Sequence, residues 1–380
     1  MADKSLFALT LMVAFQSLAS AVTGIFLPNY YLQIGLSINQ IILLIAVTML
    51  MVGLLPILTL KFLPRYFEKL IVVGIILGMV FFALLIFVKS PIILGVAWGL
   101  TLATFWPSFN LLLYRLTKVK NRGLVVSLLY VAVPTVTGVI GPFVGGLLIH
   151  FSSFNTLFIV GIALLAVALV FSLKVRYEPV VSDFKVPANR LSLIFAVIII
   201  LFGFLSASQF LAYPLFLNKL TGGFLKMGAV DSLLVLIFAV ISLVAGRVSR
   251  VGRHRVNFTI IGLVLGAAWL VIMAFVMNVP ELVAASVVSG VSGALVFMLF
   301  ALYGDFFKRG QHAMLVVLWE VFLMVGRLLN LIPTGVYINS FNFGGYFLVS
   351  GAISLTVIIP LLLLKRMYKN KSVVADVAQS

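Results

Sequence analysis

Long apolar segments recur along the chain and are separated by short polar ones. Each is about as long as the 20 residues that a helix needs to cross the hydrocarbon core of a bilayer. The longest polar stretch, Lys174–Arg190, lies near the middle and leaves six apolar segments on each side. Prolines such as Pro28, Pro91 and Pro280 stand between segments and indicate turns. We predict spanning helices over residues 5–27, 39–60, 70–88, 91–114, 123–149, 154–174, 191–217, 228–246, 256–277, 281–303, 313–337 and 343–365.

The two sets of six segments resemble each other. Three features return in the same order at offsets of 187 to 189 residues: Gly74 as Gly262, Pro91 as Pro280 and Arg122 as Arg309. Six segments per repeat give both halves the same orientation, as in transporters whose parallel repeats enclose a central site. We therefore predict an all-α polytopic membrane protein with two six-helix bundles. The bundles are residues 1–174 and 191–367, joined by a linker, 175–190, and followed by a tail, 368–380.

Composition and charge support a membrane protein and fix an orientation. The chain is 63% hydrophobic and 9% charged, whereas soluble proteins are about 25% charged. Of its 26 basic residues, 22 fall on the side of the predicted N-terminus and only Lys89, Lys219 and Lys226 on the other. This bias predicts cytoplasmic termini in the plasma membrane, and it explains the net charge of +17 without a nucleic-acid partner. The apolar N-terminus resembles a signal peptide, but its length and its place in the repeat predict that it is retained.

The fifth segment carries the most specific motif. Gly141, Pro142, Gly145 and Gly146 form the pattern GPxxGG, and together with the six-plus-six organisation this resembles the antiporter motif of the major facilitator superfamily. A glycine is expected four positions before Gly141, and Thr137 stands there instead. From the residues themselves, the proline and glycines indicate a hinge or a packing surface rather than a binding site. The pairs Gly74/Gly78, Gly95/Gly99 and Gly262/Gly266 likewise indicate close helix packing.

Two basic loops resemble the gating loops of the same family. The loop after the eighth segment contains Gly246, Arg250, Gly252 and Arg253 in the order of the family's G-x-x-x-D-R-x-G-R motif. The loop after the second segment keeps the charge, including Arg65, but lacks both glycines and the aspartate. The resemblance therefore implies cytoplasmic gating loops, with the first loop closing by some other contact.

Three charged residues inside the apolar segments are candidates for coupling or substrate binding. Glu320 and Arg327 lie in the eleventh segment, and Asp231 opens the eighth near its outer end. A charge at the bilayer centre is costly, so such groups face a partner, a cavity or a proton pathway. Seven residues separate Glu320 from Arg327, a rise of about 10.5 Å, which is too far for a close contact. The alternatives are a structural ion pair for Glu320, outward snorkelling for Arg327 and an interfacial carboxylate for Asp231.

Polar side chains at helical spacing predict a cavity lining. One face of the first segment and one face of the seventh are polar, and a polar pair lies one turn apart in the fourth. The alternative is hydrogen bonding between helices. In the family that the chain resembles, the first, fourth, seventh and tenth segments line the cavity. The residues are Gln16, Ser20, Thr23, Trp106, Asn110, Ser206, Gln209 and Tyr213.

These features favour a secondary transporter that moves a small organic solute by alternating access. GPxxGG favours proton-coupled efflux, with Glu320 carrying the proton. An uptake symporter or a uniporter of an organic anion or sugar is the alternative, and a non-transporting receptor or scramblase is a distant one. The chain lacks cysteine, a His/Cys metal motif, a GxxxxGK[ST] motif and a nucleophile–base set, so we expect no metal, no cofactor and no enzyme. We expect a monomer in the lipid bilayer.

Overall fold

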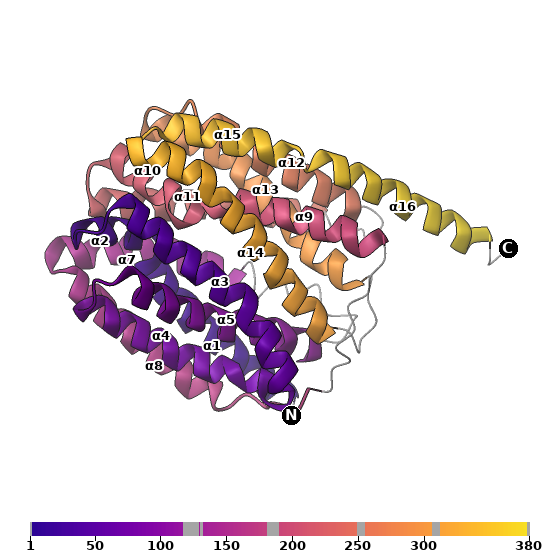
Figure 1. Ribbon diagram of the computed structural model, residues 1–380, viewed down its shortest axis with the longest axis horizontal. Coiled ribbons are helices and arrows are strands. Elements are labelled where there is room, and N and C mark those ends of the chain that lie inside the picture. The colour runs from indigo at the N-terminus through magenta and orange to yellow at the C-terminus, as the bar shows by residue number, and fades with distance from the viewer. Residues whose placement is uncertain are drawn as a thin grey trace.

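The computed structural model describes residues 2–116, 129, 132–180, 190–248, 255–305 and 312–377. Within these ranges the regular structure is helical and contains no strand (Figure 1). We call the helices before the linker the first half. They are α1 (Ala2–Thr23), η1 (Gly24–Phe26), α2 (Leu27–Gln33), α3 (Ile38–Phe62), η2 (Pro64–Lys69), α4 (Leu70–Phe87), α5 (Pro91–Leu116), α7 (Val133–Phe151) and α8 (Phe154–Ser172).

The helices after the linker form the second half. Helix α16 continues into the segment predicted as the tail. The elements are α9 (Arg190–Ser206), η4 (Ala207–Phe210), α10 (Ala212–Thr221), α11 (Phe224–Val248), α12 (Arg255–Met273), α13 (Val279–Asp305), α14 (His312–Tyr337), η7 (Ile338–Ser340), α15 (Phe343–Leu355) and α16 (Ile358–Val377).

Within the described residues, the predicted spans match the helices of the structure. The predicted fifth span, 123–149, is described only at residue 129 and from residue 132 onward. Eleven helical stretches in the described ranges are long and apolar enough to cross a membrane. The predicted tenth span, 281–303, falls in α13, whose described apolar stretch is shorter, Val279–Gly293. The all-α class is therefore confirmed.

The first span is longer than predicted. A turn is expected at Pro28, but the structure places Pro28 in the first turn of α2, and the helical stretch continues to Gln33. Proline lacks an N–H group, and the first turn of a helix needs none there, so Pro28 starts α2 rather than ending the span. The next helix begins with a capping box. Ser37 Oγ accepts from the Gln40 N–H group, and Gln40 Oε1 accepts from the Ser37 N–H group.

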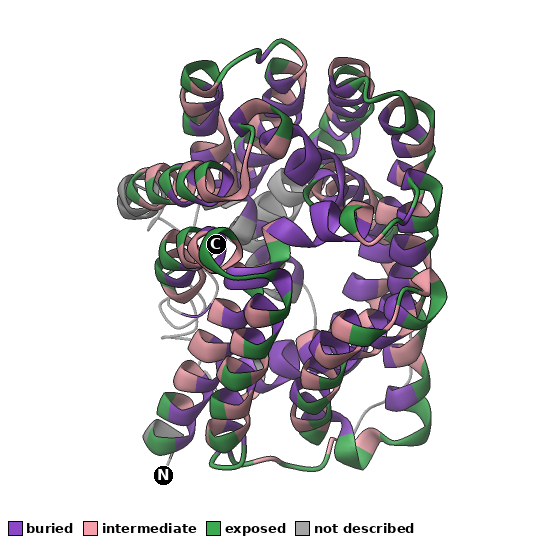
Figure 2. Cartoon of the chain, turned by 90° about the vertical axis from the view of Figure 1, so that its left-hand side faces the viewer, coloured by how far each residue is buried: buried purple, intermediate pink, exposed green. Residues whose placement is uncertain are grey.

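The outer surface of the bundle is apolar. On α3, Leu50, Leu54 and Leu58 are 40%, 47% and 50% exposed, and their spacing of four residues puts them on one side of the helix. Figure 2 shows exposed and buried residues alternating around individual helices. An extensive apolar surface on a folded chain indicates contact with lipid.

Glycines allow the helices inside each half to approach closely, as expected. A Cβ atom at Gly95 or Gly99 would lie within 3 Å of a backbone oxygen of α3, at Leu44 and Thr48 respectively. Thr48 Oγ1 donates to the Gly95 carbonyl oxygen at 3.1 Å and fixes this approach. A Cβ atom at Gly262 of the second half would lie 2.9 Å from the backbone nitrogen of Val296 in α13, and the Gly262 carbonyl accepts from Ser292 Oγ at 2.8 Å.

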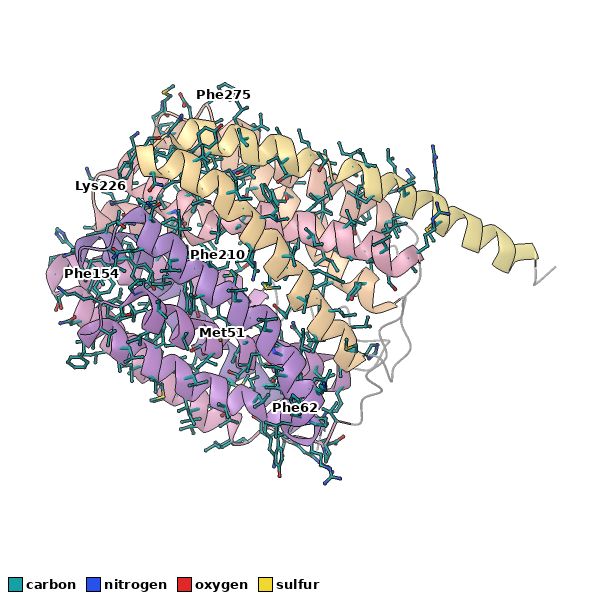
Figure 3. The ribbon with its side chains drawn as sticks, viewed as in Figure 1. Met51, Phe62, Phe154, Phe210, Lys226 and Phe275 are labelled. Carbon is teal, nitrogen blue, oxygen red and sulfur yellow. The ribbon has the colours of Figure 1, made fainter. Side chains whose placement is uncertain are left out.

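The two halves pack side by side along two seams. Helix α7 packs against α11, and α3 packs against α14. Both chain ends lie toward the right-hand ends of the helices in Figure 1. We call this the basic end because it carries Lys61, Arg65 and Arg115, and we call the other, where α2 meets α10, the opposite end. Phe62 and Phe154, labelled in Figure 3, mark the basic and the opposite end.

Candidate functional site

A cavity of about 350 Å³ lies between the two halves. Its volume is in the range of small-molecule sites. Six lining residues come from α1, η1 and α7, and ten come from η4, α10, α11, α12 and α13. They are Ser20, Ala21, Gly24, Ile25, Gly138 and Pro142 from the first half, and Gln209, Tyr213, Asp231, Leu234, Val235, Phe238, Trp269, Leu282, Ser286 and Ser289 from the second.

Asp231 gives this cavity a carboxyl group. Helix α11 begins at Phe224, so Asp231 lies two turns inside the helix, about 10 Å along its axis, and not at the start of the span as predicted. The sequence suggests a later start because Lys226 and the glycines around it resemble a loop. Tyr213 Oη donates to Asp231 Oδ1 at 3.2 Å. The pairing joins α10 to α11 and holds the carboxylate at the cavity wall.

Aromatic rings form part of the same wall. The rings of Tyr213 and Trp269 have centroids 6.1 Å apart at an angle of 54°, and Phe238 also lines the cavity. The Trp269 indole Nε1 is buried without a hydrogen-bond partner among the described residues. A buried donor without a partner is costly. The sequence does not indicate Trp269, because an aromatic residue in an apolar segment looks like an ordinary core residue.

Three of the eight predicted lining residues, Ser20, Gln209 and Tyr213, line this cavity together with Asp231. They bring the predicted polar faces of the first and seventh segments to one place. Ser20 is exposed and Asp231 is half-buried, so both reach open space. The predicted spacing therefore locates the meeting point of the two halves, although it does not select every residue there.

The other five lie outside this cavity. Thr23 faces α8, where its methyl group would lie 3.4 Å from a Cβ atom at Gly161. Ser206 Oγ donates to the Gly203 carbonyl within its own helix at 3.0 Å. The remaining three are Trp106, whose ring packs between Phe105 and Phe109, and the buried Gln16 and Asn110, whose amide oxygens lack a described partner.

Glu320 and Arg327 lie on α14, away from the cavity lining. Glu320 is only 5% exposed and has no hydrogen bond or ion pair among the described residues. The Arg327 guanidinium lies 5.1 Å from the centre of the Phe210 ring, which Figure 3 labels. The two charges do not form an ion pair with each other, as their predicted separation requires. Helix α14 packs against α9 in its own half and against α3 in the other, so Glu320 lies on a helix of one of the two seams.

The GPxxGG motif is a packing surface between helices. Cβ atoms at Gly141 and Gly145 would collide with α1 at Ala21 and Val22. Gly146 faces the backbone of Phe224, and the Phe143 N–H group donates to Ser232 Oγ of α11 at 3.0 Å. The motif therefore lets α7 contact α1 in its own half and α11 in the other. Pro142 of the motif also lines the cavity, so the motif is not only the packing surface that the sequence predicts.

The basic end holds an ion-pair network at the first predicted gating loop. The Arg115 guanidinium contacts both Glu68 oxygens, at 2.6 and 2.8 Å, and the Glu178 carboxylate at 3.0 Å. The Glu178 N–H group donates to Glu68 at 2.9 Å, so the network ties η2, α5 and the linker together. Arg65 is exposed and outside it. Gly246 lies in α11, whereas Arg250, Gly252 and Arg253 lie outside the described residues.

Asparagines join the halves at the opposite end. Asn218 Nδ2 donates to Asn29 Oδ1 at 2.8 Å, and Asn339 donates to Asn39 at 2.8 Å. Asn29 and Asn218 are 189 residues apart, the offset that relates Pro91 to Pro280. They are therefore equivalent positions of the two repeats that meet each other. The repeat offset is the sequence signal that identifies this pair.

A comparison with protein families decides the classification. A family model described as "Major Facilitator Superfamily" matches residues 9–194 and again residues 193–379. The chain belongs to the Major Facilitator Superfamily. The two matches also confirm the two-repeat fold. A comparison with curated protein sequences gives no match.

Solved structures of other transporters share the fold. The human organic anion transporter MFSD10 (TETRAN) has a TM-score of 0.73 and 14% identity, with 95% of this chain and 99% of that chain covered. An auto-inhibited POT family peptide transporter has a TM-score of 0.75 and 11% identity, with 95% of this chain and 96% of that chain covered. The nucleoside transporter NupG has a TM-score of 0.65 and 15% identity, with 94% of this chain and 98% of that chain covered. At these identities the likeness shows the fold of this Major Facilitator Superfamily transporter and not its solute.

Proposed function

We propose that the protein is a secondary transporter that moves a small organic solute by alternating access, and that the cavity holding Asp231 is its solute site. The observation that carries the proposal is that both halves line one cavity. A solute bound there touches α1 and α7 on one side and α10 to α13 on the other. Movement of one half against the other then changes which membrane face the solute can reach.

The basic end faces the cytoplasm in this proposal, and the membrane is the plasma membrane. Basic loops collect on the cytoplasmic side of multi-pass proteins. Transport is coupled to protons through Glu320, because α14 contacts both halves and a buried carboxylate there is costly unless it is protonated or paired. The resemblance of GPxxGG in α7 to the family's antiporter motif favours export of the solute. The transporter acts as a monomer.

Access from both faces can be tested with a single thiol. The chain has no cysteine, so Ser286→Cys places a unique thiol in the cavity. In proteoliposomes, a membrane-impermeant methanethiosulfonate is added outside or trapped inside. Alternating access predicts that the cavity thiol reacts from both faces. The controls are Lys61→Cys at the basic end and Ser340→Cys at the opposite end, each of which reacts from one face and reports orientation. Reaction of the Ser286→Cys thiol from one face only contradicts the proposal.

A further inference from the structure

The charge of the cavity points to the class of solute. Asp231 is the single charged residue among its lining residues, and no lysine, arginine or histidine is among them. We propose that the cavity binds an organic cation with an apolar or aromatic body. This inference rests on the proposed function, because it names the solute of the same site.

Asp231 has capacity left for a cationic ligand. A carboxylate can accept about four hydrogen bonds, and the described contact is the single one from Tyr213. All three ion pairs among the described residues lie at the basic end, between Arg115 or Arg176 and an acid. Among the residues that the structure describes, Asp231 therefore has no basic side chain as a partner. A carboxylate within a membrane span is costly when unpaired, so a cationic solute would remove that cost.

The walls around Asp231 suit a cation rather than an anion. The faces of aromatic rings carry partial negative charge and attract cations within about 6 Å of the ring centre. Tyr213, Trp269 and Phe238 supply three rings, and Leu234, Val235 and Leu282 supply apolar surface. Arg327 contacts the Phe210 ring and does not line the cavity. An anion placed here would meet Asp231 without a compensating basic residue.

The charge preference of the cavity can be measured without knowing the natural solute. The Ser286→Cys thiol is reacted with a cationic reagent, 2-(trimethylammonium)ethyl methanethiosulfonate, and an anionic one, 2-sulfonatoethyl methanethiosulfonate. Both reactions are measured with Asp231 intact and in the double variant with Asp231→Asn. The readout is the rate with the cationic reagent divided by the rate with the anionic reagent. Neutral methyl methanethiosulfonate measures the reactivity of the thiol itself. Because a carboxylate concentrates cations locally, the ratio should fall at least about tenfold in Asp231→Asn and persist in the charge-conserving Asp231→Glu.

A binding measurement uses matched probes. We expect 1-methyl-4-phenylpyridinium to protect the cavity thiol from the neutral reagent. We expect 4-phenylpyridine, which is uncharged at pH 8 and is therefore not attracted by the Asp231 charge, to protect it at least about tenfold less well. Biphenyl-4-carboxylate should not protect. Protection by 1-methyl-4-phenylpyridinium should be lost in Asp231→Asn.

Two results overturn the cation proposal. One is a rate ratio that Asp231→Asn leaves unchanged, and the other is protection by the carboxylate or the neutral probe that equals or exceeds protection by the cation. Both leave the proposed function standing if the thiol still reacts from both membrane faces. Conversely, a charge preference seen from one face only would keep the cation site and remove alternating access.

Discussion

Asp231 and Glu320 are both acidic residues inside predicted spans, yet their surroundings differ. Asp231 is half-buried at a cavity wall, accepts a hydrogen bond from Tyr213 and lies among aromatic rings. Glu320 is buried on α14, which packs against α3 and α9, and makes no described hydrogen bond or ion pair. The same functional group therefore meets a space for a solute in one place and a helix seam in the other. This difference suggests that Asp231 binds the solute and Glu320 carries the proton.

The largest expected effect separates the two roles. Glu320→Gln keeps the shape of the side chain but cannot take up a proton, so solute accumulation driven by a pH gradient should fall to the level of protein-free vesicles. Exchange of solute down its own gradient should remain. Proteoliposomes given a pH gradient and external 1-methyl-4-phenylpyridinium measure accumulation, and proteoliposomes preloaded with it measure exchange. Asp231→Asn is the matched control and should lower both. Accumulation that survives in Glu320→Gln would remove Glu320 as the proton carrier.

Affinity for the solute should depend on Asp231 and not on Glu320. 1-Methyl-4-phenylpyridinium has no N–H group, so Asp231 attracts it by charge alone. Opposite unit charges about 4 Å apart attract by about 1 kcal/mol in water and about 4 kcal/mol near a protein surface, so Asp231→Asn should weaken its binding by about ten- to a hundredfold. Glu320→Gln should change the affinity by less than about twofold, because Glu320 does not line the cavity. Calorimetric titration of purified protein gives both values. Equal losses in the two variants would mean that the acids act as one unit.

The sequence predicts much of the fold because hydropathy in a membrane protein reflects the bilayer directly. Its errors have local causes. Pro28 looks like a turn but begins a helix, and Lys226 looks like a loop residue but lies in the first turn of α11. Neither error changes the order of the spans, since both occur at helix ends.

The site is predicted less completely than the fold. Helical spacing identifies Ser20, Gln209 and Tyr213, but it also includes Thr23, which faces α8. Periodicity shows which residues share a face and not which neighbour that face meets. Trp269 carries no polar signal in sequence and is known only from its position beside Tyr213. Such contacts between segments far apart in the chain require the structure.

A smaller effect tests how Asp231 is positioned. Tyr213→Phe removes the hydroxyl that donates to Asp231 and keeps the aromatic ring. The variant keeps the carboxylate charge that attracts the cation and loses only the hydrogen bond that positions it, so cation affinity should fall by about two- to tenfold, less than in Asp231→Asn. The double variant Tyr213→Phe with Asp231→Asn should be no weaker than Asp231→Asn alone. An additive loss would show that the hydroxyl contacts the solute independently.

The smallest expected effect concerns access to the two acids. Asn218→Ala removes the hydrogen bond to Asn29 that joins α10 to α2 at the opposite end, near the cavity. One such bond contributes about 0.5–1 kcal/mol, so the population open at that end should rise about two- to fivefold. The Ser286→Cys thiol should then react faster with reagent supplied on that face. A thiol beside Glu320, in Val321→Cys, should not react faster from the same face, because α14 is packed on both sides there.

Asn339→Ala is the control, since its bond to Asn39 is exposed and should matter less. Faster reaction at both thiols would mean that the two acids share one route to that face, and the separation of their roles would fail.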